Sequence, residues 1–374
     1  MKKIFFLCAL CASMAVMAEA PTGAINGKFT INANGDQVYF SQGNLQYQAS
    51  TNTWRFAEHQ YDRVSDGTRP CTVKANDVAC SNLLASATYD GWIDLFSWGT
   101  SGWNGGNAIN YQPWSMAATP TDARTEIDFE DYGYGPFSDA NLWENIAGTQ
   151  YDWGVHNAIS NGGDQAGLWR TLTKEEWNYI LYERPNADSL RSYACVLNVK
   201  TAGGWFDAIS GWVLLSDDYR FPLSGKDPFI PRAEQHDTVS NYVDLDMFNA
   251  ITTDEHFKQR WCGLVFLPFA GYREDATQVY EPRYRGHYWT SSISDDWQDV
   301  SYVYFSPEDI TLAGNQRAPF SGLSVRLVQD APKSTTACAN VQSDKQQSTK
   351  VLRNGQLLIE RGGKTYNAQG VELK

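Results

Sequence analysis

The segment Arg285–Ser292, RGHYWTSS, lies at the centre of the fold prediction and poses its main question. It sets a histidine beside two aromatic residues and three hydroxyl groups, which suits either an active site or a buried strand. A serine nucleophile needs a base, and that base needs an orienting acid. No sequence feature pairs His287 with a carboxylate. We therefore interpret the segment as a strand end, with Trp289 packed inward and Ser291 and Ser292 bonded to backbone or to a neighbouring loop.

Strand-like segments surround this stretch on both sides. They are short, rich in β-branched and aromatic residues, and bounded by turn residues, which is typical of strands. The clearest are CGLVFLPF (262–269), VSYVYFS (300–306) and GLSVRLV (322–328). They predict a compact core of short strands joined by long loops.

The strongest helix signal is LTKEEWNYILYER, residues 172–184. Thr173 and Glu176 have the spacing of a capping box, and three apolar residues share one face at helical spacing. Those residues are Trp177, Ile180 and Leu181. A second helix is expected over residues 244–260. Two helices and several strands together predict the α+β class.

Five segments in chain order resemble the FISUMP-like (major paralogous domain) exported proteins: GLWRTLTKEEWNYIL, SGWVLLSDDYRFP, LPFAGYR, RGHYWTSS and GLSVRLV. The fold of that group is similar to C-type lectins and to the formylglycine-generating enzyme. The resemblance covers about residues 165–328. It implies a C-type lectin-like domain with short twisted antiparallel strands, two helices and long loops. Within that core we expect four residues to be buried together, namely Trp177, Leu267, Trp289 and Val325.

The ends of the chain differ in composition from the middle. Residues 1–20 have the two lysines, the apolar run and the small-residue site of a secretory signal peptide. We expect a domain over 21–330 with a strand-rich extension at 21–165, a polar linker at 331–349, and a small β-meander at 350–374. Asn354-Gly355, Gly362-Gly363 and Gln369-Gly370 are its turn signals. This tail resembles the sorting domains of type IX secretion cargo, and a simple docking tail is the alternative.

The charge balance restricts the partners. The chain has 30 Lys+Arg against 43 Asp+Glu, a formal net charge of −13. An acidic chain is poorly suited to a phosphate backbone, so no nucleic-acid partner is expected. No segment after the signal is long and apolar enough for a transmembrane helix. The predicted location is secreted or on the outer cell surface.

Cysteine usage fits an exported chain. Cys71 and Cys80 flank a short polar loop and are expected to form a disulfide bond. Cys195 and Cys262 lie in apolar runs, as buried free thiols or as a pair, and the sequence leaves this open. Residues 270–328 contain no cysteine. The redox-active cysteine pair of the formylglycine-generating enzyme is therefore missing from its place, which argues against that activity.

Calcium sites of sugar-binding lectins are not recognisable here. Glu281-Pro282-Arg283 has a cation where an oxygen ligand is needed, and Asp295-Asp296-Trp297 has the wrong order. A structural calcium ion in the acidic loop is left open, with a solvated loop as the alternative. Its candidate ligands are Asp122, Glu126, Asp128, Glu130 and Asp131. No other cofactor, metal site or catalytic residue is assigned.

The predicted function is that of an exported, surface-associated, non-enzymatic binding protein for a glycan or a protein ligand. Aromatic and charged residues in the loops 272–285 and 294–298 suit stacking and hydrogen bonding to a ligand. The candidate contact residues are Arg273, Tyr284, Arg285, Asp295, Asp296 and Trp297. The alternatives are a secreted hydrolase that uses acidic loop residues, and a structural component of a surface appendage.

Overall fold

The computed structural model divides the chain into two compact units, Met1–Ala331 and Pro332–Lys374. It describes residues 20–64, 71–72, 86–103, 113, 145–200, 206–219, 241–246, 248, 263–273, 278–294, 300–317, 319, 321–333, 349–353, 356–361, 364–367 and 372–373. The signal segment 1–19, the acidic loop 114–144 and the linker residues 334–348 lie outside the described residues. No helix among the described residues is long and apolar enough to cross a membrane.

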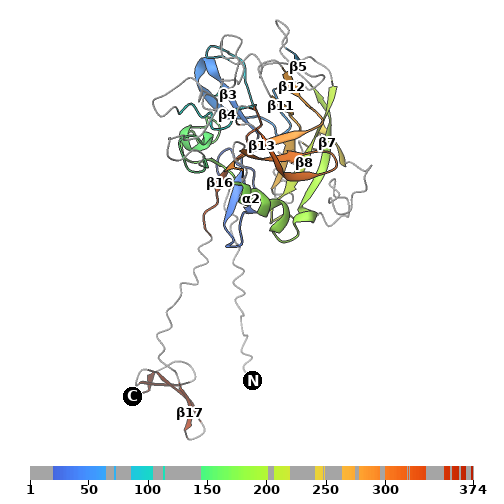
Figure 1. Ribbon diagram of the computed structural model, residues 1–374. Coiled ribbons are helices and arrows are strands. Elements are labelled where there is room, and N and C mark those ends of the chain that lie inside the picture. Colours follow the sequence, from blue (N-terminus) through green and yellow to red (C-terminus); the bar gives the residue numbers. More distant parts are fainter. Residues whose placement is uncertain are drawn as a thin grey trace. The chain divides into compact units, whose positions relative to one another are not determined.

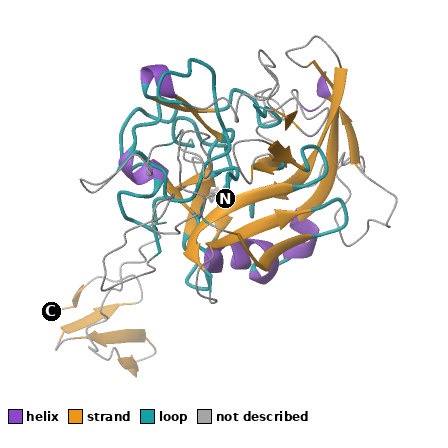
Figure 2. Ribbon diagram, turned by 45° about the horizontal axis from the view of Figure 1, so that its top comes forward, coloured by secondary structure: helices purple, strands orange, loops and turns teal. Residues whose placement is uncertain are grey.

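The first unit is β-rich, and the predicted α+β class with two helices is wrong. Across all described residues of both units, 42% are in strands and 12% in helices, and the sheets are mostly antiparallel (Figure 2). In the expected second helix at 244–260, residues 245, 246 and 248 are helical and directly follow strand β9, Asn241–Asp244, while residues 247 and 249–260 lie outside the described residues. The physical reason is that Gly-rich turns and aromatic runs favour hairpins, whereas a strong helical period occurs only after Thr173.

Two four-stranded sheets form much of the first unit (Figure 1). One has the order β1 (Phe29–Thr30), β2 (Gln37–Phe40), β16 (Leu327–Asp330) and β6 (Arg170–Thr171). The other has the order β10 (Leu264–Pro268), β8 (Phe206–Leu215), β7 (Arg191–Lys200) and β9. All neighbouring pairs in these two sheets are antiparallel except β7 with β9.

Three smaller sheets complete the first unit. They are β11 (Tyr272–Arg273), β12 (Gln278–Tyr280) and β5 (Cys71–Thr72); β13 (Gly286–Ile293), β14 (Val300–Phe305) and β15 (Ile310–Arg317); and β3 (Leu45–Gln48) with β4 (Thr53–Phe56). Isolated bridges connect them, including Gly271 with Gly286 and Arg273 with Gly322. The segments predicted as strands at 262–269, 286–292 and 300–306 are thus confirmed as β10, β13 and β14.

The predicted helix start at Thr173 is confirmed. Helix α2 covers Lys174–Asn178, and the Thr173 hydroxyl accepts a hydrogen bond from the Glu176 amide while the Glu176 carboxylate accepts one from the Thr173 amide. The chain continues as the π-helix η5 (Tyr179–Glu183) and the 3-10 helix η6 (Ala187–Leu190). Other short helices among the described residues include α1 (Trp153–His156) and η1 (Ala49–Thr51).

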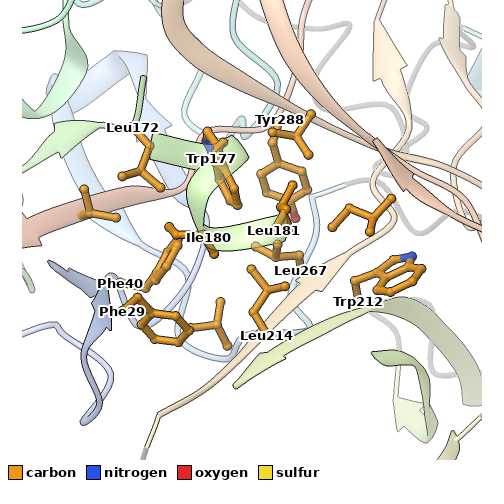
Figure 3. Close-up of a cluster of buried hydrophobic side chains, with 14 of the residues drawn as sticks. Phe29, Phe40, Leu172, Trp177, Ile180, Leu181, Trp212, Leu214, Leu267 and Tyr288 are labelled. Carbon is orange, nitrogen blue, oxygen red and sulfur yellow. The ribbon is translucent and has the colours of Figure 1, made fainter. Parts of the chain in front are cut away.

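The core consists of separate apolar clusters on opposite faces of the strands. Trp177 and Leu267 lie in the cluster beneath α2 (Figure 3), whereas Trp289 and Val325 lie in another. All four are buried, as expected, but they are not buried together. Neighbouring residues of a strand point to opposite faces, so Tyr288 joins the first cluster and Trp289 the second.

The second unit contains one antiparallel sheet with its strands in chain order, which is a meander. The strands are β17 (Thr349–Arg353), β18 (Gln356–Arg361), β19 (Lys364–Asn367) and β20 (Glu372–Leu373). Asn354-Gly355 and Gly362-Gly363 separate the first three strands. Such two-residue connections match the short hairpin loops that these residue types favour.

Candidate functional site

Strand β13 contains the RGHYWTSS segment, and its hydroxyl groups have structural partners. Ser291 donates a hydrogen bond to the Thr171 carbonyl, and the Ser292 hydroxyl accepts one from the Lys174 amide at 3.0 Å. That amide is in the first turn of α2, where backbone N–H groups lack partners within the helix. The serines therefore join α2 and β6 to β13, as the strand interpretation predicted.

On the same strand, His287 is buried among the rings of Tyr272, Tyr302 and Tyr304, and we name these four residues the His287 cage. The imidazole centre is 4.8 Å from the ring centre of Tyr272, 5.3 Å from Tyr304 and 5.6 Å from Tyr302. His287 pairs with Tyr304 across β13 and β14, while Tyr302 is two residues away on the same face. Only 1% of His287 is exposed. The cage therefore holds one titratable ring beneath an aromatic layer.

The electrostatics of the cage centre on Glu281. Its Oε2 lies 3.6 Å from Nε2 of His287, which is an ion-pair distance but too long for a hydrogen bond. Neither ring nitrogen of His287 has a hydrogen-bond partner within the described part of the chain. Burial lowers the pKa of His287, and Glu281 opposes that shift. Contact with His287, aided by the charges of Arg285 and Arg317, lowers the pKa of Glu281.

Two arginines lie on the rings of the cage. The guanidinium of Arg317 is 3.8 Å from the ring centre of Tyr272, and that of Arg285 is 5.5 Å from Tyr304. A guanidinium over an aromatic face is attracted to the ring and still presents its N–H edge. Tyr272 also stacks on Tyr280 at 5.4 Å, because these two residues pair across β11 and β12. The cage is thus covered by cations and by further aromatic surface.

A tight turn at residues 281–285 precedes β13 and carries the exposed residues Glu281 and Tyr284. Glu281 and Arg283 have positive φ values of 52° and 75°, which non-glycine residues rarely adopt. The turn is held by the amides of Tyr284 and Arg285, which both donate to the Glu281 carbonyl. Such outliers persist only where surrounding structure enforces them, and they concentrate at functional sites. The turn leaves Tyr284 69% exposed.

An ion-pair network around the buried carboxylate of Asp207 holds the turn in place. Asp207 on β8 pairs with both Arg283 and Arg63, and its side chain is only 4% exposed. Arg63 also donates to the Phe269 carbonyl at 2.9 Å. Removing one partner of such a network leaves a buried charge uncompensated, which is strongly destabilising. Asp207 and its arginines therefore fix the position from which Tyr284 and Arg285 are presented.

The predicted contact residues are placed differently from one another. Tyr284 is exposed and Arg285 is partly exposed, which fits a contact role. Arg273 is 1% exposed and donates to Ser97, so its burial does not fit a contact with a surface ligand. Asp295, Asp296 and Trp297 lie outside the described residues.

The predicted loop 272–285 ends where β13 begins, whereas the predicted loop 294–298 lies outside the described residues after Ser294. This strand has eight residues, and at about 3.3 Å per residue it is roughly 25 Å long. The candidate site is built from the described residues alone, without the loop 295–298. It consists of the 281–285 turn together with the cage, and we name its accessible part the outer loop surface: Glu281, Tyr284, Arg285, Tyr304 and Glu308.

Several residues of this site were missed from the sequence, namely Tyr302, Tyr304, Glu308 and Arg317. One signal was available. VSYVYFS alternates in a way that puts Tyr302 and Tyr304 on one face of a strand. The sequence contains no signal for Arg317, because its contact with Tyr272 depends on how strands distant in sequence pack together.

Other predicted sites lie mostly outside the described residues. Cys80 and the acidic loop are among the residues not described, so the Cys71–Cys80 disulfide and the structural calcium stay predictions. Cys195 is a buried free thiol whose pKa is raised by burial, while Cys262 is not described. Within the described part of the chain, no group of three His, Cys, Asp or Glu side chains could hold a metal ion.

No family model matches the chain, and no match was found among curated proteins or solved structures.

Proposed function

We propose that this protein is an exported, non-enzymatic binding protein that contacts a glycan through the outer loop surface. The observation that carries the proposal is the exposed ring of Tyr284 on a turn that is anchored by buried Asp207. Tyrosine combines a flat apolar face with a hydroxyl group, which suits the alternating faces and hydroxyls of sugars. Binding residues are commonly placed on loops that a rigid scaffold positions.

The surroundings of Tyr284 support a contact surface rather than a core edge. Arg285 and Glu308 pair at 3.3 Å with side chains that are 30% and 75% exposed. Tyr304 beside them is partly buried. This mixture supplies stacking area, hydrogen-bond donors and hydrogen-bond acceptors on one surface. A surface held by a strained turn also loses little conformational freedom when a ligand binds.

The test is a glycan-array screen of the exported chain, followed by calorimetric titration of the best glycan. We expect Tyr284→Ala to weaken binding by about tenfold or more, as loss of an aromatic hot spot does. The melting temperature should be unchanged. Tyr242→Ala is the matched control, since Tyr242 is 66% exposed on β9, a strand that contributes no residue to the outer loop surface. It should bind like the parent.

Three outcomes would contradict the proposal. Equal losses in Tyr284→Ala and Tyr242→Ala would show a nonspecific effect of removing exposed rings. An unchanged affinity in Tyr284→Ala would place the site elsewhere. If no glycan binds, or if bound oligosaccharides are cleaved, the protein-ligand and hydrolase alternatives take precedence over this function.

A further inference from the structure

The arginines of the 272–285 segment differ in what their charges already contact. Arg273 is buried, and Arg283 is paired with the buried carboxylate of Asp207. Arg285, in contrast, pairs with Glu308, whose side chain is 75% exposed. An exposed ion pair contributes little net stability because water competes for both partners. A carboxylate from a ligand can therefore replace Glu308 beside Arg285 at little cost.

The geometry around Arg285 favours a planar anion. Its guanidinium lies over the Tyr304 ring, which restricts its orientation while leaving in-plane N–H groups for hydrogen bonds. Carboxylates match this arrangement, since they accept two parallel hydrogen bonds from one guanidinium. Tyr284, whose ring is exposed, directly precedes Arg285 in the chain, so a sugar ring can stack beside the charge.

The wider cage adds one further cation, the guanidinium of Arg317, which lies over Tyr272. Burial lowers the pKa of His287, so its ring favours the neutral form. The charged groups that face His287 are Glu281, Arg285 and Arg317. Arg285 is the one cation among the residues of the outer loop surface, beside the carboxylates of Glu281 and Glu308, on a chain whose net charge is −13. An anionic ligand is repelled by most of such a chain, so a local site for it has to be built.

We propose that the ligand of the outer loop surface is a sugar that carries a carboxylate, bound by Arg285 and stacked on Tyr284. This inference rests on the proposed function and specifies its ligand class. It makes Glu308 an internal competitor for Arg285, since both carboxylates need the same N–H groups. Removing the carboxylate of Glu308 should therefore strengthen ligand binding, whereas removing the guanidinium of Arg285 should weaken it.

The test compares each acidic glycan with its neutral counterpart on the full exported chain. The probes are trigalacturonate and sialyllactose, each against its methyl ester, measured by calorimetric titration in low salt. We expect at least one acid to bind about tenfold or more tightly than its ester, the range for a charge-assisted hydrogen-bonded contact. Arg285→Gln should abolish that preference, and Glu308→Gln should strengthen binding of the acid several-fold, an order-of-magnitude expectation.

Arg191→Gln is the control, because Arg191 also lies over a tyrosine ring and pairs with an exposed carboxylate, and neither Arg191 nor its partner Asp188 belongs to the outer loop surface. It should leave the preference unchanged. Equal affinity for acids and esters, or a preference that survives Arg285→Gln, would overturn the inference. Binding confined to neutral glycans would overturn it while leaving the proposed function intact. Absence of any glycan binding would defeat both.

Discussion

His287 is the residue whose surroundings depend most on long-range packing. Three tyrosine rings cover it, and Glu281 is its nearest carboxylate. Burial favours the neutral ring, because a charged imidazolium loses its hydration there. The carboxylate partly compensates for that loss. A pH titration can separate these two contributions.

We expect His287 to titrate below its usual pKa of about 6.5, and lower still in Glu281→Gln, because the carboxylate that favours the imidazolium is gone. Since the folded pKa is depressed, the contribution to stability is complete above about pH 6.5 and is lost as the pH falls toward the folded pKa. NMR titration of the imidazole protons, assigned with His287→Gln, measures the shift. A pKa above the usual value, or one unaffected by Glu281→Gln, would contradict this expectation.

A second prediction for a single residue concerns the packing of Trp289 in the core. Its ring is 1% exposed, and its indole N–H donates to the Phe96 carbonyl at 2.7 Å. We expect Trp289→Ala to lower the free energy of unfolding by about 3–5 kcal/mol, the usual cost of deleting a large buried aromatic side chain. Denaturant unfolding measures this, with the 73% exposed Phe206→Ala as control. Equal stability of the two variants would refute the assigned core.

At the scale of elements, the turn before β13 depends on how closely two chain segments approach. The Gly271 amide donates to the Arg285 carbonyl at 2.9 Å, and Gly271 bridges to Gly286. A Cβ at Gly271 would lie 2.1 Å from the Tyr280 carbonyl oxygen, and its φ of +71° already disfavours a side chain. This position therefore needs glycine both for conformation and for space.

A comparison of two glycines separates these effects. Gly35 has a φ of +81°, and a Cβ there would have nothing within 4 Å. Gly35→Ala should cost only the backbone strain, about 1–2 kcal/mol. Gly271→Ala should cost clearly more and should also weaken glycan binding, because Tyr280 and the turn have to move. Thermal unfolding and calorimetry check both effects. Equal costs would mean that the close approach at Gly271 is unimportant.

For the whole molecule, the prediction concerns export. The first twenty residues resemble a signal peptide that ends after Ala20. We therefore expect exported protein to begin at Pro21, and an oxidising environment to join Cys71 to Cys80. Mass spectrometry of non-reduced peptides tests both. An intact N-terminus would contradict the first expectation, and two free thiols would contradict the second. Cys195, buried as a free thiol, is the internal reference for an unpaired cysteine.

Local patterns in the sequence predicted those features that depend on neighbouring residues. The capping box at Thr173 and Glu176 and strands β10, β13 and β14 belong to this group. Their signals come from hydrogen bonds a few residues apart or from the two-residue period of a strand. Burial of Trp289 followed from its place in an apolar strand. The FISUMP-like resemblance stays a prediction, because no comparison tests it.

The tertiary structure alone decided the fold class, the division of the core and the site. Which face of β13 meets α2 depends on pairing with strands far away in sequence, so Trp177 and Trp289 lie in different clusters. Arg273 and Arg285 both lie in one predicted loop, yet one is buried and the other partly exposed. Contacts between sheets set this difference. The sequence determined which segments become strands and where α2 begins, whereas the burial of side chains between distant strands decided which residues a ligand can reach.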